Sequence, residues 1–498
     1  TNAPMQSFSG DLFAEINITS SGRRAFREAG MTLAASAENL AAITLTPPAP
    51  ALAAVVWDNN PEVFEVDQDR LVDAAGVPLL LNPQLVPGSH FSASGVLGFE
   101  FGGYELFPDT INVFAPAPPI PGTVPTAGPA QLTVASLNML RFYDRCDDPT
   151  RPNTDEVVNL AQVTIKLDKL SRYIREVLKS PDVIGAQEVE QASVGGTVCA
   201  NGEANVSTLQ LLADKILADG GPSYTPVLAP LTNDIGWINV GFLVQAARVN
   251  IGVTQHIQAD HPWVFNGLTQ TQLHDRPSLL LEATTLFTPT PLDFTVIVNH
   301  LRSLSGIDTL TNTTTQTNAH RVRQKRLRQA VDVACAAQAY QSVNPTRPLI
   351  LIGDFNAFQF ADGYADTLGI LRGDTVPSQS EYGIDFIPPG ERCDNPFNGQ
   401  VVSPALAEAV FSLPPDERYS FYFRGVPQEL DHGLLSTTAS QRFEKMAYGR
   451  GNADSRNDQV AVVGNALRSS DHDGFVLYLN AGTGPTNNGF TLFKDGFE

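Results

Sequence analysis

The stretch from Leu349 to Phe358, LILIGDFNAF, constrains the fold of this chain most. Its apolar run is typical of a strand that is buried on both faces, and the run ends abruptly at Gly353. Asp354 and Asn356 follow two residues apart, so their side chains point the same way on an extended backbone. Such a pair at the carboxyl edge of a sheet can hold one phosphate or one hydrated cation. Taken alone, a strand that ends in Gly-Asp is also a common turn.

Further apolar runs in the chain end in polar residues. These are Asn138 in LTVASLNML, Glu188 in DVIGAQEVE, His300 in FTVIVNHLRS, Asp431 in QELDHGLLS, and Asp471 with His472 in RSSDHDGF. In isolation, a His or Asn at a strand end is more often a hydrogen-bonding or turn-forming residue than a catalyst. The ordered set is far more specific than any of its members.

With these residues in this order, positions 130 to 480 resemble the endonuclease/exonuclease/phosphatase superfamily, the group of pancreatic deoxyribonuclease and the abasic-site endonucleases. Within it, the large secreted bacterial nucleases are the most similar. The resemblance implies an α/β fold, a four-layer sandwich of two packed β-sheets flanked by helices. It also implies a hydrolase that cleaves phosphodiester bonds with Mg²⁺ or Mn²⁺, and it leaves open whether Ca²⁺ is bound as a structural ion.

The resemblance also assigns catalytic roles. His472, paired with Asp431, is the candidate general base, because the carboxylate holds the ring in one tautomer. Asp354 and Asn356 would orient the attacking water and hold the phosphate, and the choice of base between Asp354 and His472 stays open. His300 would donate a hydrogen bond to a phosphate oxygen or assist the leaving group.

The candidate metal ligands are Glu188, Asn138 and Asp471. A hard divalent cation prefers oxygen ligands and keeps several waters, so one dominant carboxylate can be enough. Glu188 takes that place because of its position in the Gln-Glu pair. No Ser or Cys belongs to the constellation, so no covalent intermediate is implied.

A dense basic run, HRVRQKRLRQ, begins at His320. On a helix, Arg321, Lys325 and Arg328 share one face, which makes them candidates for binding a nucleic-acid backbone. A solvated helix face is an equally good interpretation. The chain has 32 Lys and Arg against 53 Asp and Glu, a net charge of −21, which argues against a DNA-coating role but not against an enzyme with a local positive site.

Four parts are predicted along the chain. Residues 1–113 form a β-rich module, in one part or two, 114–130 a Pro/Gly-rich linker, 131–482 the catalytic domain and 483–498 a terminal tail. Secreted relatives carry a small oligonucleotide-binding (OB) barrel in the first position, and SGVLGFEFGGYELFP is similar to its closing strands. Because basic residues are few in this module, a packing or spacer role is favoured over single-strand binding.

The four cysteines, Cys146, Cys199, Cys335 and Cys393, lack the spacing of a zinc site and predict disulfides. Of the three pairings, Cys146 with Cys199 and Cys335 with Cys393 is favoured, because each pair flanks one motif region. No stretch approaches the roughly 20 apolar residues of a membrane span. Together with a start at Thr1, these features predict a trimmed, secreted bacterial protein, extracellular or periplasmic and monomeric.

Nucleic acid, DNA above all, is the expected substrate. The first alternative is a secreted phosphodiesterase or phosphatase that acts on phospholipid headgroups or inositol phosphates. A lipid-directed enzyme should show an exposed aromatic hairpin, and none is obvious in the sequence. The second alternative is a degenerate binding module that keeps the fold without catalysis.

Overall fold

The fold is known from a computed structural model. It describes residues 6–8, 11–13, 15–30, 57–68, 74–75, 85–100, 103–146, 156–192, 198–199, 201–202, 205–229, 238–257, 259–265, 268–270, 272–309, 312–313, 316–362, 366–374, 393 and 400–482. The tail 483–498 therefore lies outside the described residues.

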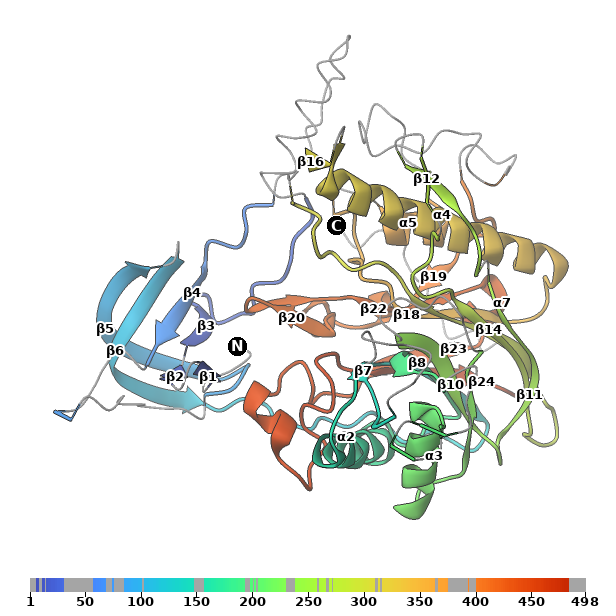
Figure 1. Cartoon of the computed structure of the whole chain (residues 1–498), viewed down its shortest axis with the longest axis horizontal. Helices are drawn as coiled ribbons and strands as arrows, with labels where there is room; N and C mark the ends of the chain where they lie inside the picture. Colours follow the sequence, from blue (N-terminus) through green and yellow to red (C-terminus); the bar gives the residue numbers. More distant parts are fainter. Residues whose placement is uncertain are drawn as a thin grey trace, which may run out of the picture.

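Two six-stranded sheets stack face to face (Figure 1). The first has the order β23-β24-β7-β8-β10-β9, with β23 Phe443–Tyr448, β24 Phe475–Asn480, β7 Gln131–Phe142, β8 Val183–Glu190, β10 Ile238–Gln245 and β9 Tyr224–Val227. The second has the order β11-β14-β15-β18-β22-β19, with β11 Val249–His256, β14 Leu279–Thr285, β15 Asp293–His300, β18 Leu349–Asp354, β22 Asp431–Leu435 and β19 Ala407–Glu408.

Helices cover the outer faces of both sheets. In Figure 1, α2 (Leu160–Arg172) and α3 (Thr208–Ala218) lie below the first sheet, and α4 (Asn318–Val343) and α5 (Thr367–Arg372) lie above the second. Short elements complete the sandwich: β12 Trp263–Phe265, β13 Leu268–Gln270, β16 Asn312–Thr313, β17 Gln316–Thr317, β20 Phe421–Phe423, β21 Val426–Gln428 and α7 Thr437–Ser440. The predicted four-layer α/β sandwich is confirmed.

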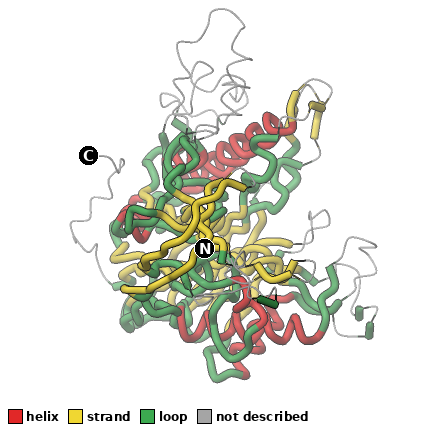
Figure 2. Tube along the Cα trace, turned by 90° about the vertical axis from the view of Figure 1, so that its left-hand side faces the viewer, coloured by secondary structure: helices red, strands yellow, loops and turns green. Residues whose placement is uncertain are grey.

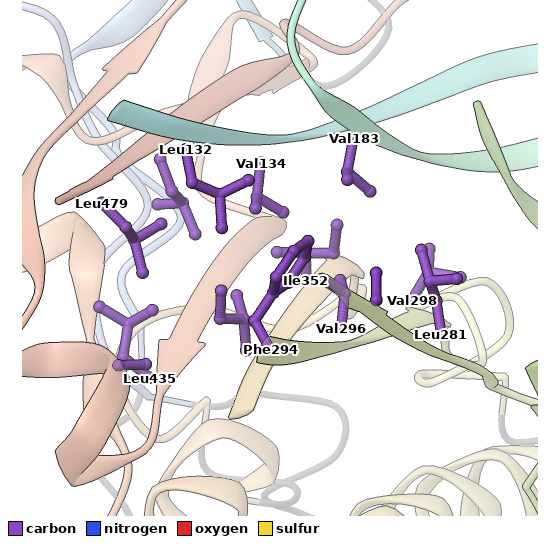
Figure 3. Close-up of a cluster of buried hydrophobic side chains, with 14 of the residues drawn as sticks. Leu132, Val134, Val183, Leu281, Phe294, Val296, Val298, Ile352, Leu435 and Leu479 are labelled. Carbon is purple, nitrogen blue, oxygen red and sulfur yellow. The ribbon is translucent and has the colours of Figure 1, made fainter. Parts of the chain in front are cut away.

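Strand β18 shows why the apolar run forms the centre of this fold. Ile350 and Ile352 point into the core between the sheets, whereas Leu349 and Leu351 pack in the core beneath α4. Figure 3 shows the core between the sheets, with Ile352 in its middle. Gly185 of β8 lets the sheets approach closely here, since a Cβ at this position would lie 2.6 Å from Ile352 Cδ1. Because successive side chains of a strand point to opposite faces, this fully buried strand contributes to the core on each side of its sheet.

The first helix of the sandwich, α2, begins at a side-chain cap. Asn159 caps α2 in a capping box with Gln162. Val163 and Leu170 are buried on its inner face. A π-helical turn, Tyr173–Val177, continues the helix toward β8. This helix returns the chain from the carboxyl end of β7 to the start of β8, so the two parallel strands end at the same edge.

A separate four-stranded sheet precedes the sandwich, in the order β3-β4-β6-β5, with β3 Glu15–Thr19, β4 Val63–Asp67, β6 Gly103–Ala115 and β5 His90–Glu100. Figure 2 views this module in front of the sandwich. A two-stranded piece, β1 (Gln6–Phe8) with β2 (Asp11–Phe13), precedes it. The β-rich character agrees with the prediction, and the OB-like topology stays a prediction.

The hairpin of β5 and β6 differs from what the sequence suggested. Its side chains Val96, Leu97, Phe99 and Tyr104 are 66%, 60%, 62% and 59% exposed, and Phe99 and Tyr104 meet edge to face. An exposed aromatic hairpin is therefore present. The alternation of Gly and apolar residues concealed it, because the same pattern fits a strand with one buried face.

The segment after β6 runs along the sandwich. Gly122 pairs with Arg450 through two backbone hydrogen bonds, and Val124 is buried in the core beneath α2. The module contacts the sandwich as well, through an ion pair of 2.8 Å between Arg24 and Asp454. The domain boundaries stay predictions.

Two disulfides join Cys146 to Cys199 and Cys335 to Cys393, the pairing favoured from the sequence. Such bonds persist in oxidising compartments and are compatible with an extracellular location. Within the described ranges, the structure contains no helix with the length and hydropathy of a membrane span.

Candidate active site

The strand ends that carry polar residues meet at one edge of the sandwich because of the register between strands. In the second sheet, parallel pairing of β15 with β18 sets His300 beside Asp354. Antiparallel pairing of β18 with β22 sets Asp354 beside Asp431. In the first sheet, β7 and β8 are parallel, with Asn138 opposite the residue before Glu188. Each sheet therefore delivers its polar residues to the same edge.

Asp354 is the centre of the site and is buried. Asn138 donates a hydrogen bond of 3.0 Å to its Oδ2 from the opposite sheet. The Nε2 atoms of His300 and His472 lie 3.6 and 3.9 Å from the same oxygen. Burial raises the pKa of the Asp354 carboxyl to about 7, and the charge of His472 acts against this rise. Three residues distant in sequence thus surround one carboxylate.

The turn after β18 holds Asn356 in place. Its backbone N–H donates to Asp354 Oδ1 at 2.8 Å, and its Nδ2 donates to the carbonyl of Leu301 at 3.1 Å. Asn356 has a φ of 50°, and Glu188 a φ of 59°. Positive φ at two non-glycine residues of one site is a conformation that surrounding contacts must enforce, and it is common at functional sites.

His472 and Asp431 form a tight pair. His472 Nδ1 lies 2.6 Å from Asp431 Oδ2, which also accepts a hydrogen bond of 2.6 Å from the Ser420 hydroxyl. The Phe421 ring lies against the imidazole, with 4.7 Å between the ring centres. Burial would lower the pKa of His472, but the carboxylates of Asp431 and Asp354 outweigh it and raise this pKa well above its usual value. The carboxylate fixes the ring, so Nε2 is the nitrogen that faces the site.

His300 is in the opposite electrostatic state. Burial and then the charges of Arg276 and His472 hold the pKa of His300 well below its usual value, so the ring is neutral. Its Nδ1 is buried and has no hydrogen-bond partner in the part of the chain that the structure describes. A neutral imidazole beside Asp354 can donate one hydrogen bond to a substrate oxygen.

Glu188 fits a divalent cation better than Asn138 does. Glu188 Oε2 accepts a hydrogen bond of 2.8 Å from the backbone N–H of Arg141, and Oε1 lies 3.3 Å from the amide nitrogen of Asn138. Burial lowers the pKa of Lys166 to about 8, and the charges of Asp471 and Glu188 act against this fall. Carboxylate oxygens suit Mg²⁺ or Mn²⁺. Asn138 turns its amide nitrogen toward Glu188 and Asp354, and its Oδ1 accepts a hydrogen bond of 2.8 Å from the backbone N–H of Leu140, so its amide would have to turn to bind a cation. The ligand roles of all three residues stay predictions.

A buried group of Asp354, Asp431 and His472 also brings possible ligand atoms within 4.8 Å of one another. However, Asp431 Oδ2 and His472 Nδ1 already bond to each other, so without breaking this pair His472 could offer a cation only Nε2, the nitrogen that a general base needs. We therefore favour Glu188 as the principal carboxylate ligand, with Asp354 beside it.

Helix α4 places the three basic candidates unequally. Lys325 is buried and forms an ion pair of 2.5 Å with Asp275, whereas Arg321 is half-buried and contacts Asn318. Arg328 is half-buried too. Lys325 could bind a nucleic-acid backbone only by breaking its ion pair with Asp275. The role of the three residues stays a prediction.

Sequence reasoning missed three neighbours of the site: Ser420, Phe421 and Asn452. Asn452 Nδ2 donates to the carbonyl of His472 at 2.8 Å, and its Oδ1 accepts from the backbone N–H of Ser469 at 2.9 Å. It thereby clamps the loop that carries the general-base candidate. No local signal marks these residues, because their partners lie 11 to 51 positions away.

The two packed sheets and the polar residues gathered at their shared edge form the α/β sandwich that the sequence predicted from its resemblance to the endonuclease/exonuclease/phosphatase superfamily. No protein-family model matches the chain, and no curated protein matches it.

Three solved structures illustrate the likeness. The endonuclease/exonuclease/phosphatase from Bacteroides vulgatus is 13% identical, with a TM-score of 0.38, over 70% of this chain and 98% of that one. D. rerio TDP2 complexed with single strand DNA product is 16% identical, with a TM-score of 0.35, over 70% and 99%. The human Nocturnin catalytic domain with bound sulfate anion is 13% identical, with a TM-score of 0.34, over 70% and 94%. Values this low carry no argument about substrate.

Proposed function

We propose that this chain is a secreted, divalent-metal-dependent nuclease that hydrolyses phosphodiester bonds of DNA, with RNA as a further substrate to be tested. The observation that carries the proposal is the convergence on Asp354 of Asn138, His300 and the pair of His472 with Asp431. Phosphodiester hydrolysis needs an activated water, an in-line approach and stabilisation of charge on the phosphate oxygens. Each task has a candidate residue at this edge.

His472 is proposed to take the proton from the attacking water. Asp431 holds its Nδ1, which leaves Nε2 directed toward Asp354 and the substrate. A pKa above that of free histidine makes the ring a stronger base once it has lost its proton. The carboxylate charges that raise this pKa are the charges that a divalent cation would compensate.

Asp354 and Asn356 are proposed to orient the water and the phosphate, and neutral His300 to donate a hydrogen bond to a phosphate oxygen. Glu188, with Asn138 and Asp471, would hold Mg²⁺ or Mn²⁺. When bound, such a cation supplies positive charge to the phosphate oxygens and polarises water.

The experiment that tests the proposal is incubation of the protein with supercoiled plasmid and Mg²⁺, Mn²⁺ or EDTA, beside His472→Ala. Relaxed and then fragmented plasmid that requires both the cation and His472 is expected. Intact plasmid under every cation would reject the nuclease.

A second candidate is hydrolysis of phospholipid headgroups, and the exposed hairpin of Phe99 and Tyr104 favours it. Exposed aromatic and aliphatic side chains at a hairpin are suited to a lipid interface. The described part of this hairpin carries no Lys or Arg, so the attraction would be apolar rather than electrostatic. Release of phosphocholine from sphingomyelin vesicles, lost in Phe99→Ser, would support this function over the nuclease.

A further inference from the structure

Three arginines from three different segments approach the His300 side of the site. Arg276 precedes β14, whose first residue, Leu279, pairs with Val298 near the end of β15. The hydroxyl of Ser278 donates to Asn299 at 2.7 Å, which holds this segment beside His300. Arg276 therefore lies at the catalytic edge of the second sheet.

The second and third arginines are Arg302 and Arg321. Arg302 follows His300 by two residues, and Arg326 donates to the carbonyls of both Arg302 and Asn356 at 2.7 Å. The loop of Arg302 is thus tied to the catalytic turn. Arg321 lies one helical turn before Lys325, whose ion pair with Asp275 brings the start of α4 to the segment of Arg276.

The local charge in this group is positive. Burial lowers the pKa of Arg302, and the charges of Arg321 and Arg276 lower it further, against the opposing effect of Asp275. Asp275 is already paired with Lys325. The Nε of Arg276 is buried and, among the residues with described positions, meets no hydrogen-bond acceptor. A buried guanidinium nitrogen without an acceptor is costly, and a bound anion would supply the acceptor.

We propose that Arg276, Arg302 and Arg321 bind a second phosphate of the substrate, adjacent to the phosphate that is cleaved, and that the substrate is a nucleic-acid strand. The inference rests on the proposed function and specifies its substrate. Arginine forks bind phosphate in two-point contacts, and a nucleic-acid strand presents phosphates at regular intervals. A choline headgroup offers a cation at the corresponding place, which the three arginines would repel.

The test compares two substrates that differ by one phosphate, the thymidine dinucleotide TpT and the trinucleotide TpTpT, with the wild type, Arg276→Ala, Arg321→Ala and Lys179→Ala. Arg321 lies on a half-buried helix face, so its variant keeps the proposal testable if Arg276→Ala fails to fold. Lys179 lies before β8, at the opposite edge of the sheet, and is the charge-matched control.

Each arginine variant is expected to lose roughly 10-fold more kcat/KM with TpTpT than with TpT, because only TpTpT carries the second phosphate. For a longer single strand, the salt dependence of KM should weaken by about one unit of log-log slope. Lys179→Ala should leave the ratio of the two substrates unchanged. Equal losses with both substrates, or no loss with either, would overturn the inference.

Bis(p-nitrophenyl) phosphate carries only one phosphate, so it distinguishes failure of the second phosphate site from failure of the proposed function. If the wild type hydrolyses this ester but does not discriminate between TpT and TpTpT, the second phosphate site is rejected and the proposed function is kept. No hydrolysis of any of the three substrates rejects both. Inositol 1,4-bisphosphate hydrolysed in preference to TpTpT, with the preference lost in Arg276→Ala, would overturn the assignment to nucleic acid.

Discussion

The Nδ1 atom of His472 lies 2.6 Å from Oδ2 of Asp431, although 41 residues of sequence separate them. Asp431 begins β22 in the second sheet, and His472 precedes β24 in the first. The pair therefore exists only when the two sheets are packed. Ser420 fixes the carboxylate from its other side, so the imidazole has one orientation.

Replacing Asp431 by Asn should lower kcat by roughly 10²- to 10⁴-fold, because an amide cannot stabilise the imidazolium that forms when His472 takes a proton. The measurement is steady-state hydrolysis of bis(p-nitrophenyl) phosphate with saturating Mg²⁺. Ser420→Ala is the matched control and should cost roughly 10-fold or less, since the carboxylate remains. A kcat for Asp431→Asn within twofold of the wild type would contradict the role of the pair.

Replacing Glu188 by Gln should weaken Mn²⁺ binding by at least roughly 10-fold, because the site loses its principal anionic oxygen. Isothermal titration of the EDTA-treated protein with Mn²⁺ measures this affinity apart from activity. Glu176→Gln, which removes an exposed carboxylate from the π-helical turn, is the control. Unchanged Mn²⁺ affinity in Glu188→Gln would remove Glu188 from the ligands.

Glu429 should make stability depend on pH. Burial raises the pKa of this carboxyl to about 8, against the attraction of His432, and its Oε2 has no hydrogen-bond partner within the described chain. Because the folded state holds the Glu429 proton more tightly than the unfolded state, proton binding contributes to the stability of the fold. This contribution is complete below about pH 4.5 and is lost as the pH rises toward 8.

Glu429→Gln should therefore become more stable relative to the wild type as the pH rises from 5 to 9, by roughly 1–3 kcal/mol at the upper end. The amide keeps an acceptor for the Tyr448 hydroxyl, which bonds to Glu429. Urea unfolding at pH 5, 7 and 9 measures the difference. A constant difference across this range would show that Glu429 titrates alike in both states.

The disulfide between Cys335 and Cys393 closes a loop with a sequence separation of 58. Replacing both residues by Ala should lower the free energy of unfolding by roughly 2–4 kcal/mol, because the unfolded chain gains freedom. Urea denaturation of the variant and of the oxidised wild type gives this value. kcat at 25 °C should stay within about twofold, since Cys335 lies in α4 and packs against the core beneath that helix, not at the catalytic edge. A large loss of kcat in the folded variant would tie the loop to the site.

Local pattern was enough to predict several features of this protein. The apolar run of β18 predicted a strand that is buried on both faces, and the polar residues after it and after β15 predicted an edge with chemistry. In α2, the apolar residues Val163 and Leu170 recur at helical spacing, so the local sequence also favours this helix. These features depend on the repeat of apolar residues, every two residues in a strand and every 3.6 in a helix, and on the residues at the ends of strands and helices. Residues close together in the sequence determine both.

Packing between distant segments decided the rest. Lys325 shares a helix face with Arg321 in sequence, yet it is buried because Asp275 approaches α4 from the start of β14. Ser420 became a partner of Asp431, and Arg276 a neighbour of His300, because antiparallel strands bring their ends together. The β5–β6 hairpin exposes its aromatic rings because no described element covers them. An alternating pattern shows which residues share a face of a strand, whereas only the completed fold determines whether that face meets another sheet, a helix or water.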